Sequence, residues 1–186
     1  MTIAWFDCET TNLDPAMTRV LEVALVVTDD RLEELANYSA LVNPGNINRV
    51  RNQVEPFVES MHDESGLWEA LLVGPTISLF DAELDMLNVI DECVGQHGTV
   101  TLGGMGVSHF DHPLITHQMD MLAKRLTYWD YDVSVVRRFF KLTGDTTEWP
   151  QVQPAHRAMP DVETAIWHAK EIKRRFAIVT PDATEA

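Results

Sequence analysis

Positive charge is scarce in this sequence. Fourteen Lys and Arg residues stand against 29 Asp and Glu residues, which leaves a formal net charge of -15 over 186 residues. Proteins that grip long nucleic acids take much of their affinity from Lys and Arg side chains on phosphates. The composition therefore argues against an extended nucleic-acid grip. It is compatible with a small footprint, metal-mediated contacts or a local basic patch.

Cysteine and long apolar runs are also scarce. The chain has two cysteines, Cys8 and Cys93, and two such distant thiols form no disulfide framework, so we expect a reducing, cytoplasmic location. No stretch approaches the roughly 18 apolar residues of a membrane span, and the N-terminus shows no charged-then-apolar leader. We therefore expect no membrane association and no secretory signal.

Apolar residues are plentiful enough for a sizeable core. Hydrophobic residues make up 45% of the chain, and the length is typical of one domain, which we expect over residues 1–178 with a polar tail at 179–186. Strand and helix patterns alternate, which predicts an α/β fold with a mixed β-sheet flanked by α-helices. The predicted strands are 3–6, 19–28, 34–42 and 98–102, with an aromatic, β-like stretch at 128–134. The predicted helices are 76–93, 111–125, 134–141 and 161–177.

Three finer expectations concern single residues within these elements. Glu22 is the one acidic residue in the second strand, and we expect it to face solvent rather than to serve as an extra acidic group at a site. Ser134 is the expected cap of the helix that follows it. The run that begins at Gly103 lacks GxGxxG spacing and indicates a tight strand exit where a neighbouring backbone approaches closely.

Two carboxylates stand at the end of the first predicted strand. Asp7 and Glu9 are two residues apart, and side chains two apart on a strand point to the same face. Like charges that converge repel one another, and a divalent cation that prefers carboxylate oxygens, such as Mg²⁺ or Mn²⁺, would neutralise them. An isolated Asp-x-Glu is more often a solvated turn, so this prediction depends on acidic residues elsewhere.

Such residues follow in a specific order. Asp111 opens a predicted helix, and His156 precedes Asp161 by five positions at the start of the last helix. The predicted strand ends bring Asp7, Glu9 and Asp111 to one edge of the sheet. The ordered set of Asp-x-Glu-Thr-Thr, Phe-Asp and His-x-x-x-x-Asp resembles the DEDDh 3′–5′ exonucleases. The resemblance covers almost the whole chain, is strongest with the oligoribonuclease branch, and implies a ribonuclease H-like fold.

The resemblance implies an enzyme that hydrolyses phosphodiester bonds from the 3′ end of short single-stranded RNA and releases nucleoside 5′-monophosphates. It implies a general base, His156, beside two Mg²⁺ or Mn²⁺ ions. The implied metal ligands, which also count as catalytic residues, are Asp7, Glu9, Asp111 and Asp161. Members of this branch are usually homodimers, so we expect a homodimer.

The resemblance also implies contacts with the substrate. The implied contact residues are Thr10, Thr11, Leu13, Phe57 and His62. Leu13 would wedge between the terminal bases, and Phe57 would stack where oligoribonucleases carry tryptophan. For Leu13 and Phe57, an ordinary place in the core is the alternative.

The surroundings of Asp111 depart from the oligoribonuclease pattern. His112 and Pro113 stand where that branch has two arginines, and the Phe-Asp pair is more similar to the proofreading, epsilon-like branch. A proofreading-type exonuclease that acts on single-stranded DNA therefore stays open, as does a catalytically silent nucleic-acid-binding module of the same fold. A phosphatase with Asp7 as nucleophile is a weaker interpretation, because such enzymes use Asp-x-Asp and Glu9 occupies the second position.

Overall fold

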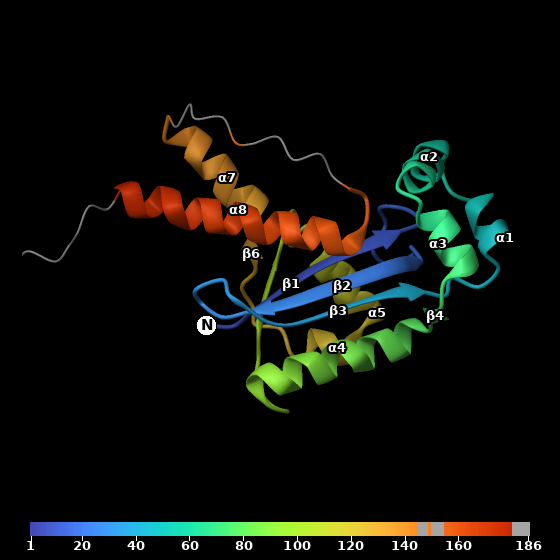
Figure 1. Ribbon diagram of the computed structural model, residues 1–186, viewed down its shortest axis with the longest axis horizontal. Coiled ribbons are helices and arrows are strands. Elements are labelled where there is room, and N and C mark those ends of the chain that lie inside the picture. Colours follow the sequence, from blue (N-terminus) through green and yellow to red (C-terminus); the bar gives the residue numbers. More distant parts are fainter. Residues whose placement is uncertain (145–148, 150–154, 180–186) are drawn as a thin grey trace, which may run out of the picture.

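The computed structural model describes residues 1–144, 149 and 155–179. A six-stranded sheet forms the middle layer, with α8 and α7 over one face, α4 and α5 against the other, and α1–α3 grouped at one end (Figure 1). The predicted mixed sheet flanked by helices is therefore confirmed. None of the helices in the described part of the chain combines the length and apolar character needed to cross a bilayer.

The sheet combines an antiparallel meander with parallel additions at both edges. Its strand order is β4-β3-β2-β1-β5-β6. Strands β1, β2 and β3 pair antiparallel, whereas β5 runs parallel to β1, β6 to β5, and β4 to β3. The strands span β1 Ile3–Thr10, β2 Val20–Thr28, β3 Glu34–Val42, β4 Thr76–Ile77, β5 Thr101–Gly104 and β6 Tyr131–Asp132.

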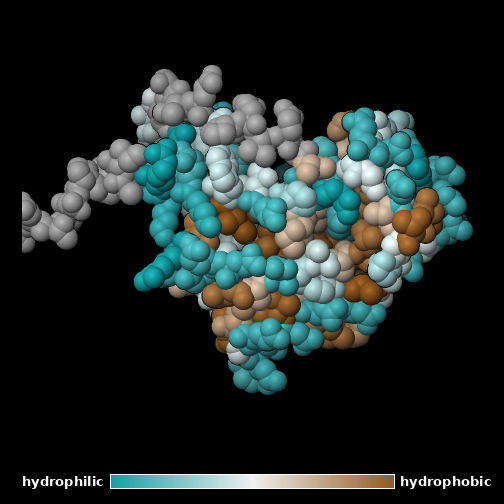
Figure 2. Space-filling view, viewed as in Figure 1, coloured by the Kyte–Doolittle hydropathy of each residue, from teal (hydrophilic) through white to brown (hydrophobic). Residues whose placement is uncertain are grey.

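Eight helices are present in the described residues. They span α1 Ile47–Arg51, α2 Pro56–Glu64, α3 Leu67–Val73, α4 Leu79–Val94, α5 Asp111–Gln118, α6 Asp120–Ala123, α7 Val133–Leu142 and α8 Ala158–Val179. The short helices α1–α3 occupy the stretch with the weakest sequence pattern, and apolar side chains are exposed among polar ones over this end of the molecule (Figure 2). Exposed apolar residues of α3 include Leu72 and Val73.

The predicted helix over 111–125 was wrong in its continuity. It is interrupted at Met119 and resumes as α6. The cause is Glu83 of α4, which is buried and accepts hydrogen bonds from the backbone N–H groups of Met121 and Leu122 at 2.8 and 2.9 Å. A carboxylate at this place satisfies N–H groups that a new helix leaves without partners.

The predicted cap of α7 was also wrong by two residues. Asp132 is the N-cap, and its carboxylate accepts hydrogen bonds from the backbone N–H and the hydroxyl of Ser134 at 2.9 and 2.6 Å. Asp132 also accepts from the N–H groups of Gly106 and Ser108, so one carboxylate ties the end of β5 to α7. The Asp side chain serves both purposes because an ionised carboxylate accepts several hydrogen bonds.

Strand β1 separates two cores. Its residues Ala4, Phe6 and Cys8 belong to the core beneath α4 and α5, whereas Ile3 and Trp5 belong to the core beneath α8. Because side chains alternate along a strand, the next residues on the α8 side are the two carboxylates of the Asp-x-Glu motif. The burial pattern of β1 therefore fixes the face on which the acidic site is built.

The close approach predicted at the glycine run is confirmed. A Cβ atom at Gly104 would lie 2.9 Å from the backbone carbonyl oxygen of Phe6, and one at Gly103 would lie 2.7 Å from Cγ2 of Ile3 and 2.9 Å from Cε3 of Trp5. The β1 residues named here lie next to these glycines because β1 and β5 pair in parallel. The absent side chain allows β5 to pair directly beside the strand that carries the acidic motif.

Candidate active site

The two carboxylates of the first motif lie at the end of β1. Glu9 is 7% exposed and Asp7 is partly exposed. Glu9 stands opposite Glu22 of β2 in the strand register. The side chains of Asp7 and Glu9 share one face of the strand, as predicted, and a third carboxylate lies across the sheet from them.

Asp111 enters the site from the first turn of α5. Its side chain is 6% exposed, and its Oδ1 accepts a hydrogen bond from the Cys8 thiol at 3.4 Å. Cys8 is buried in the core beneath α4 and α5, and its thiol contacts this carboxylate. The position at a helix N-terminus favours the negative charge of Asp111 through the helix dipole.

His156 and Asp161 arrive together at the start of α8. The Asp161 carboxylate accepts hydrogen bonds from the backbone N–H groups of Ala155 and His156, at 2.9 and 3.1 Å. His156 has a φ of 52°, which is unfavourable for a residue other than glycine. Ligand atoms of Glu9, His156 and Asp161 lie within 4.8 Å of one another. The structure thus brings the two distant motifs into one cluster.

The electrostatics of this cluster are unfavourable without a cation. Burial raises the pKa of Asp7 well above its usual range, and the nearby charges of Asp111, Glu9 and Asp161 raise it further. Burial together with the charge of Asp161 raises the pKa of Glu9 to about 7. Burial also raises the pKa of Asp111 to about 7. Several carboxyl groups therefore retain protons near neutral pH, as expected for like charges crowded in a low-dielectric site.

The donor set fits hard divalent cations. The acidic cluster, which comprises Asp7, Glu9, Asp111 and Asp161, offers carboxylate oxygens, and Mg²⁺ and Mn²⁺ prefer such ligands. A bound cation relieves the repulsion that raises the pKa of Asp7. The observation that supports the fit is the convergence of ligand atoms from Glu9, His156 and Asp161.

A cavity of about 260 Å³ opens beside the acidic cluster. Leu13 and Phe57 form part of its wall and are 84% and 76% exposed. The alternative that these two residues are ordinary core side chains is thus wrong. Large apolar side chains exposed at the edge of a polar pocket are suited to contact with a planar, apolar ligand surface. The residues that line the cavity are Asp7, Cys8, Glu9, Thr10, Asn12, Leu13, Phe57, Val58, Met61, Phe110, His156 and Asp161.

Two of the predicted substrate contacts lie elsewhere. His62 is fully buried and does not line the cavity; its Nε2 lies 2.9 Å from the Thr10 carbonyl oxygen, and its Nδ1 lies 3.7 Å from Oε2 of Glu9. Thr11 is committed to the β1–β2 loop, where its N–H donates to the Arg19 carbonyl and its hydroxyl accepts from the Arg19 N–H. The prediction that His62 contacts the substrate directly is therefore wrong. His62 instead contacts Glu9 and the end of β1.

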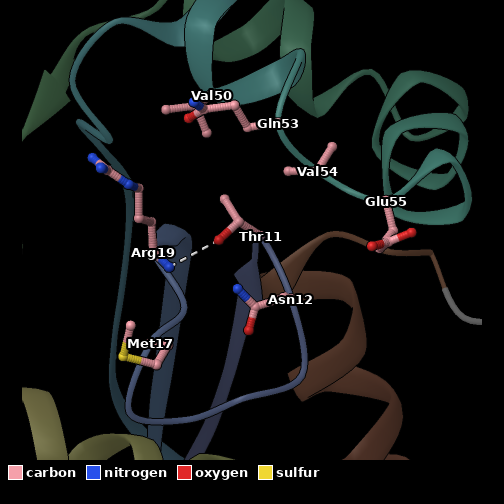
Figure 3. Close-up of a pocket in the computed structure, with 8 residues that line it drawn as sticks. All are labelled: Thr11, Asn12, Met17, Arg19, Val50, Gln53, Val54 and Glu55. Carbon is pink, nitrogen blue, oxygen red and sulfur yellow. Dashed lines mark hydrogen bonds between the residues drawn. The ribbon is translucent and has the colours of Figure 1, made fainter.

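A second hollow lies on the other side of this loop. It measures about 280 Å³, lies between the β1–β2 loop and the segment from α1 to α2, and shares Asn12 with the first cavity. Figure 3 shows Arg19 and Thr11 on one wall and Val50, Gln53 and Val54 opposite. The guanidinium of Arg19 donates to the Pro44 carbonyl at 2.8 Å. These contacts hold the loop that carries Leu13 to the edge of β2 and to the α1 region.

The expectation that Glu22 faces solvent was wrong. Glu22 is 7% exposed and pairs with Arg157, whose Nη2 lies 2.7 Å from Oε1. The pairing explains the burial, because a buried carboxylate is tolerated when a cation and hydrogen bonds satisfy it. No role was predicted for Arg157, although its place directly after His156 was the signal that could have indicated one.

The chain belongs to the RNase_T family of exonucleases, whose family model matches residues 4–167. Among curated relatives, the oligoribonuclease of Corynebacterium efficiens is 32% identical over 186 residues, which cover 99% of this chain and 83% of that protein. The oligoribonuclease of Mycobacterium ulcerans is 30% identical over 184 residues, which cover 98% of this chain and 84% of that protein. Membership of this family supports a 3′–5′ exonuclease activity for the chain.

Solved structures of exonuclease I share the fold. Exonuclease I from Methylocaldum szegediense superposes with a TM-score of 0.69 and 19% sequence identity over 96% of this chain and 42% of that chain. The zinc-bound complex of E. coli ExoI with single-stranded DNA gives a TM-score of 0.66 and 19% identity over 94% of this chain and 40% of that chain. The chain thus spans about two fifths of the length of these structures.

Proposed function

We propose that the protein is a metal-dependent 3′–5′ exonuclease that degrades short single-stranded RNA to nucleoside 5′-monophosphates. The observation that carries the proposal is the convergence of carboxylates from Glu9 and Asp161 with the imidazole of His156 beside a small cavity. The oligoribonuclease relatives, at about 30% identity, support short RNA as the substrate. The net charge of -15 supports it as well, because a small footprint needs few Lys and Arg contacts.

The acidic residues and His156 have different roles in this proposal. Asp7, Glu9, Asp111 and Asp161 would hold two Mg²⁺ or Mn²⁺ ions, and such ions would supply Lewis-acid stabilisation of negative charge on the phosphate. The imidazole of His156 accepts the proton of the attacking water in this proposal. The water oxygen bonds to phosphorus as the bond between phosphorus and the 3′ oxygen of the preceding nucleotide breaks, and this oxygen takes up a proton from solvent to become a 3′ hydroxyl.

Leu13, Phe57 and Thr10 contribute to substrate binding in this proposal. Leu13 and Phe57 place exposed apolar surfaces at the cavity, where each can stack on or wedge against a base. Thr10 also lines the cavity, and its hydroxyl donates to the Asn12 carbonyl at 2.9 Å, which orders the loop that carries Leu13. Binding through two terminal bases and the metal ligands needs no long basic groove.

The resemblance to the oligoribonucleases also supports a homodimer in the cytoplasm. Light scattering coupled to gel filtration measures the oligomeric state directly. A mass near twice the 21.0 kDa of one chain is the expected result. A mass of one chain would contradict the dimer without bearing on the catalytic site.

The test of the proposed function is a digestion series with Mg²⁺ or Mn²⁺. The substrates are 5′-labelled ribo-dinucleotides, ribo-pentanucleotides, a long RNA and single-stranded DNA. We expect the short RNAs to shorten from the 3′ end with release of nucleoside 5′-monophosphates, and the long substrates to react poorly. Chelation with EDTA removes the activity in this proposal, because the acidic cluster then lacks its cations.

The matched control is Asp7→Asn, which keeps the size of the side chain and removes its charge. Loss of cleavage in this variant assigns the activity to the acidic cluster rather than to a contaminant. Equal digestion of long DNA and RNA would instead support a proofreading-type exonuclease. Absence of metal-dependent release from every substrate would contradict the proposal and favour a silent binding module.

A further inference from the structure

The carboxylate of Glu22 accepts three close hydrogen bonds from the segment that carries His156. Nε and Nη2 of Arg157 donate at 2.9 and 2.7 Å, and the backbone N–H of Ala158 donates at 2.9 Å. Glu22 belongs to β2, in which all nine residues are buried. A guanidinium fork on a carboxylate has a fixed planar geometry, so the chain directly after His156 is attached to the centre of the sheet.

Asp161 holds the chain on the other side of His156. Its two oxygens accept from the N–H groups of Ala155 and His156, at 2.9 and 3.1 Å. His156 lies between these two carboxylate anchors with a φ of 52°. Such a conformation persists in a residue other than glycine only where the surroundings impose it. The two anchors supply that constraint over four consecutive residues, 155–158.

We infer that Glu22 and Arg157 form a clamp that positions His156 for proton transfer in the reaction proposed above. Both are positioning residues, because neither lines the cavity and both act through the backbone next to His156. The inference rests on the proposed function, in which His156 is the base. It adds two residues outside the acidic ligand set whose contribution is geometric.

A purely electrostatic role for Arg157 is the competing explanation. Arg157 is close enough to Glu9 for its charge to favour the ionised carboxylate. Lysine would preserve that charge, but it lacks the two-point fork that fixes the chain to Glu22. Arg157→Lys therefore separates the two explanations, since the clamp requires the fork and the electrostatic role requires only the charge.

The kinetic test compares Arg157→Met, Arg157→Lys and Glu22→Gln with the unmodified protein on a ribo-dinucleotide. A base displaced by about 1 Å costs on the order of 100-fold in rate, so we expect kcat to fall about 100-fold in all three variants. KM is expected to stay unchanged, because the cavity walls at Leu13 and Phe57 are not altered. Full activity in Arg157→Lys would overturn the clamp in favour of the electrostatic role.

Arg125→Met is the matched control. Arg125 is also a partly buried arginine that pairs with a carboxylate, Asp91, and that donates to two backbone carbonyls, those of Gly98 and Gly95. It lies on the α4–α6 side of the sheet, away from the cavity. We expect Arg125→Met to lose stability and to keep its kcat. An equal loss of kcat in Arg125→Met and Arg157→Met would show a general folding defect and would overturn the clamp.

Hydrogen exchange provides a readout that does not depend on activity. We expect the amide protons of His156 and Ala158 to exchange faster in Arg157→Met and Glu22→Gln, and at the normal rate in Arg125→Met. Unchanged exchange at both amides would overturn the clamp. If the unmodified protein failed to cleave the ribo-dinucleotide, the proposed function would be contradicted, whereas the exchange measurement would still decide whether the clamp holds the segment.

Discussion

His62 and Glu9 face each other with Nδ1 and Oε2 3.7 Å apart, a distance too long for a hydrogen bond. The Thr10 carbonyl at 2.9 Å from Nε2 only accepts, so Nε2 carries a proton. Burial lowers the pKa of His62, which favours the neutral ring. Its Nδ1 makes no hydrogen bond with any described residue. A neutral imidazole thus supports the end of β1 behind the acidic cluster.

This arrangement makes His62 a structural residue. We expect His62→Ala to lower the free energy of unfolding by about 2 kcal/mol or more, because the change leaves a cavity and removes the hydrogen bond to the Thr10 carbonyl. Urea denaturation measures the difference. His97→Ala is the control, since His97 is exposed and such changes stay within about 0.5 kcal/mol. Equal stability of both variants would contradict the buried position of His62.

The raised carboxyl pKa values predict that the metal-free protein loses stability as the pH rises. The pKa is raised from 4.5 to about 7 in Glu9 and from 3.8 to about 7 in Asp111. Between about pH 4 and 7 these two carboxyls therefore bind more protons in the folded chain than in the unfolded chain, which lowers the free energy of unfolding as the pH rises. Burial lowers the pKa of His168 from 6.5 to about 4, so His168 acts in the opposite direction below about pH 6.5, and the carboxyl effect is isolated above that pH. Carboxyls with a lowered pKa, such as Glu171 at about 2, change the free energy of unfolding mainly at lower pH than this window.

Thermal unfolding in EDTA at several pH values checks this prediction. We expect Tm to fall from pH 6.5 to pH 8 in EDTA, and added Mg²⁺ or Mn²⁺ to raise Tm most at pH 8, where the ligands are ionised. A Tm that rises across this range in EDTA, or a cation effect that is greatest at pH 6.5, would contradict the electrostatics of the site.

Asp7→Asn should separate stability from activity. Asp7 is the carboxyl that most neighbouring charges oppose, since Asp111, Glu9, Asp161 and Glu22 all raise its pKa. Removal of its charge is therefore expected to raise the Tm of the metal-free protein at pH 8, by about 2–4 °C for each kcal/mol recovered, while cleavage is lost. At pH 5 the difference in Tm should shrink. An Asp7→Asn variant that is less stable than the unmodified protein at pH 8 would show that the repulsion is already relieved.

The elements with strong sequence patterns were predictable, and those set by long-range contacts were not. Strand β3 has the predicted bounds 34–42, because its limits are set by local turns and alternation. The break at Met119 has no local signal, since it depends on Glu83, which is 36 positions earlier in the sequence. The predicted strand at 98–102 instead begins at residue 101, because the register with β1 decides where pairing starts.

The candidate site shows the same division. The convergence of Glu9, His156 and Asp161 was predictable from the order of their motifs, and the fold brings their ligand atoms within 4.8 Å of one another. Glu22 was misplaced because the partner that stabilises its burial, Arg157, is 135 positions away. His62 was expected at the substrate because sequence gives no measure of burial for one histidine on a short helix.

The exposed aromatic ring of Phe57 gives the last prediction. Phe57 is 76% exposed at the cavity, so Phe57→Ala removes a stacking surface and little packing. Stacking contributes roughly 1–3 kcal/mol per base, so we expect KM for a ribo-dinucleotide to rise between about 5-fold and 150-fold, while Tm changes little. Phe57→Trp should retain or lower KM, because a larger ring stacks at least as well.

Phe80→Ala controls for the loss of an exposed aromatic ring as such. Phe80 is 60% exposed on α4, on the opposite side of the sheet from α8, and we expect its removal to leave KM unchanged. Steady-state kinetics on a dinucleotide and on a pentanucleotide then separate two roles for Phe57. If Phe57 contacts only the terminal bases, both substrates lose the same factor in kcat/KM. A smaller loss for the pentanucleotide would place further nucleotides on surfaces beyond Leu13 and Phe57, and an unchanged KM for both would show that Phe57 does not stack on substrate.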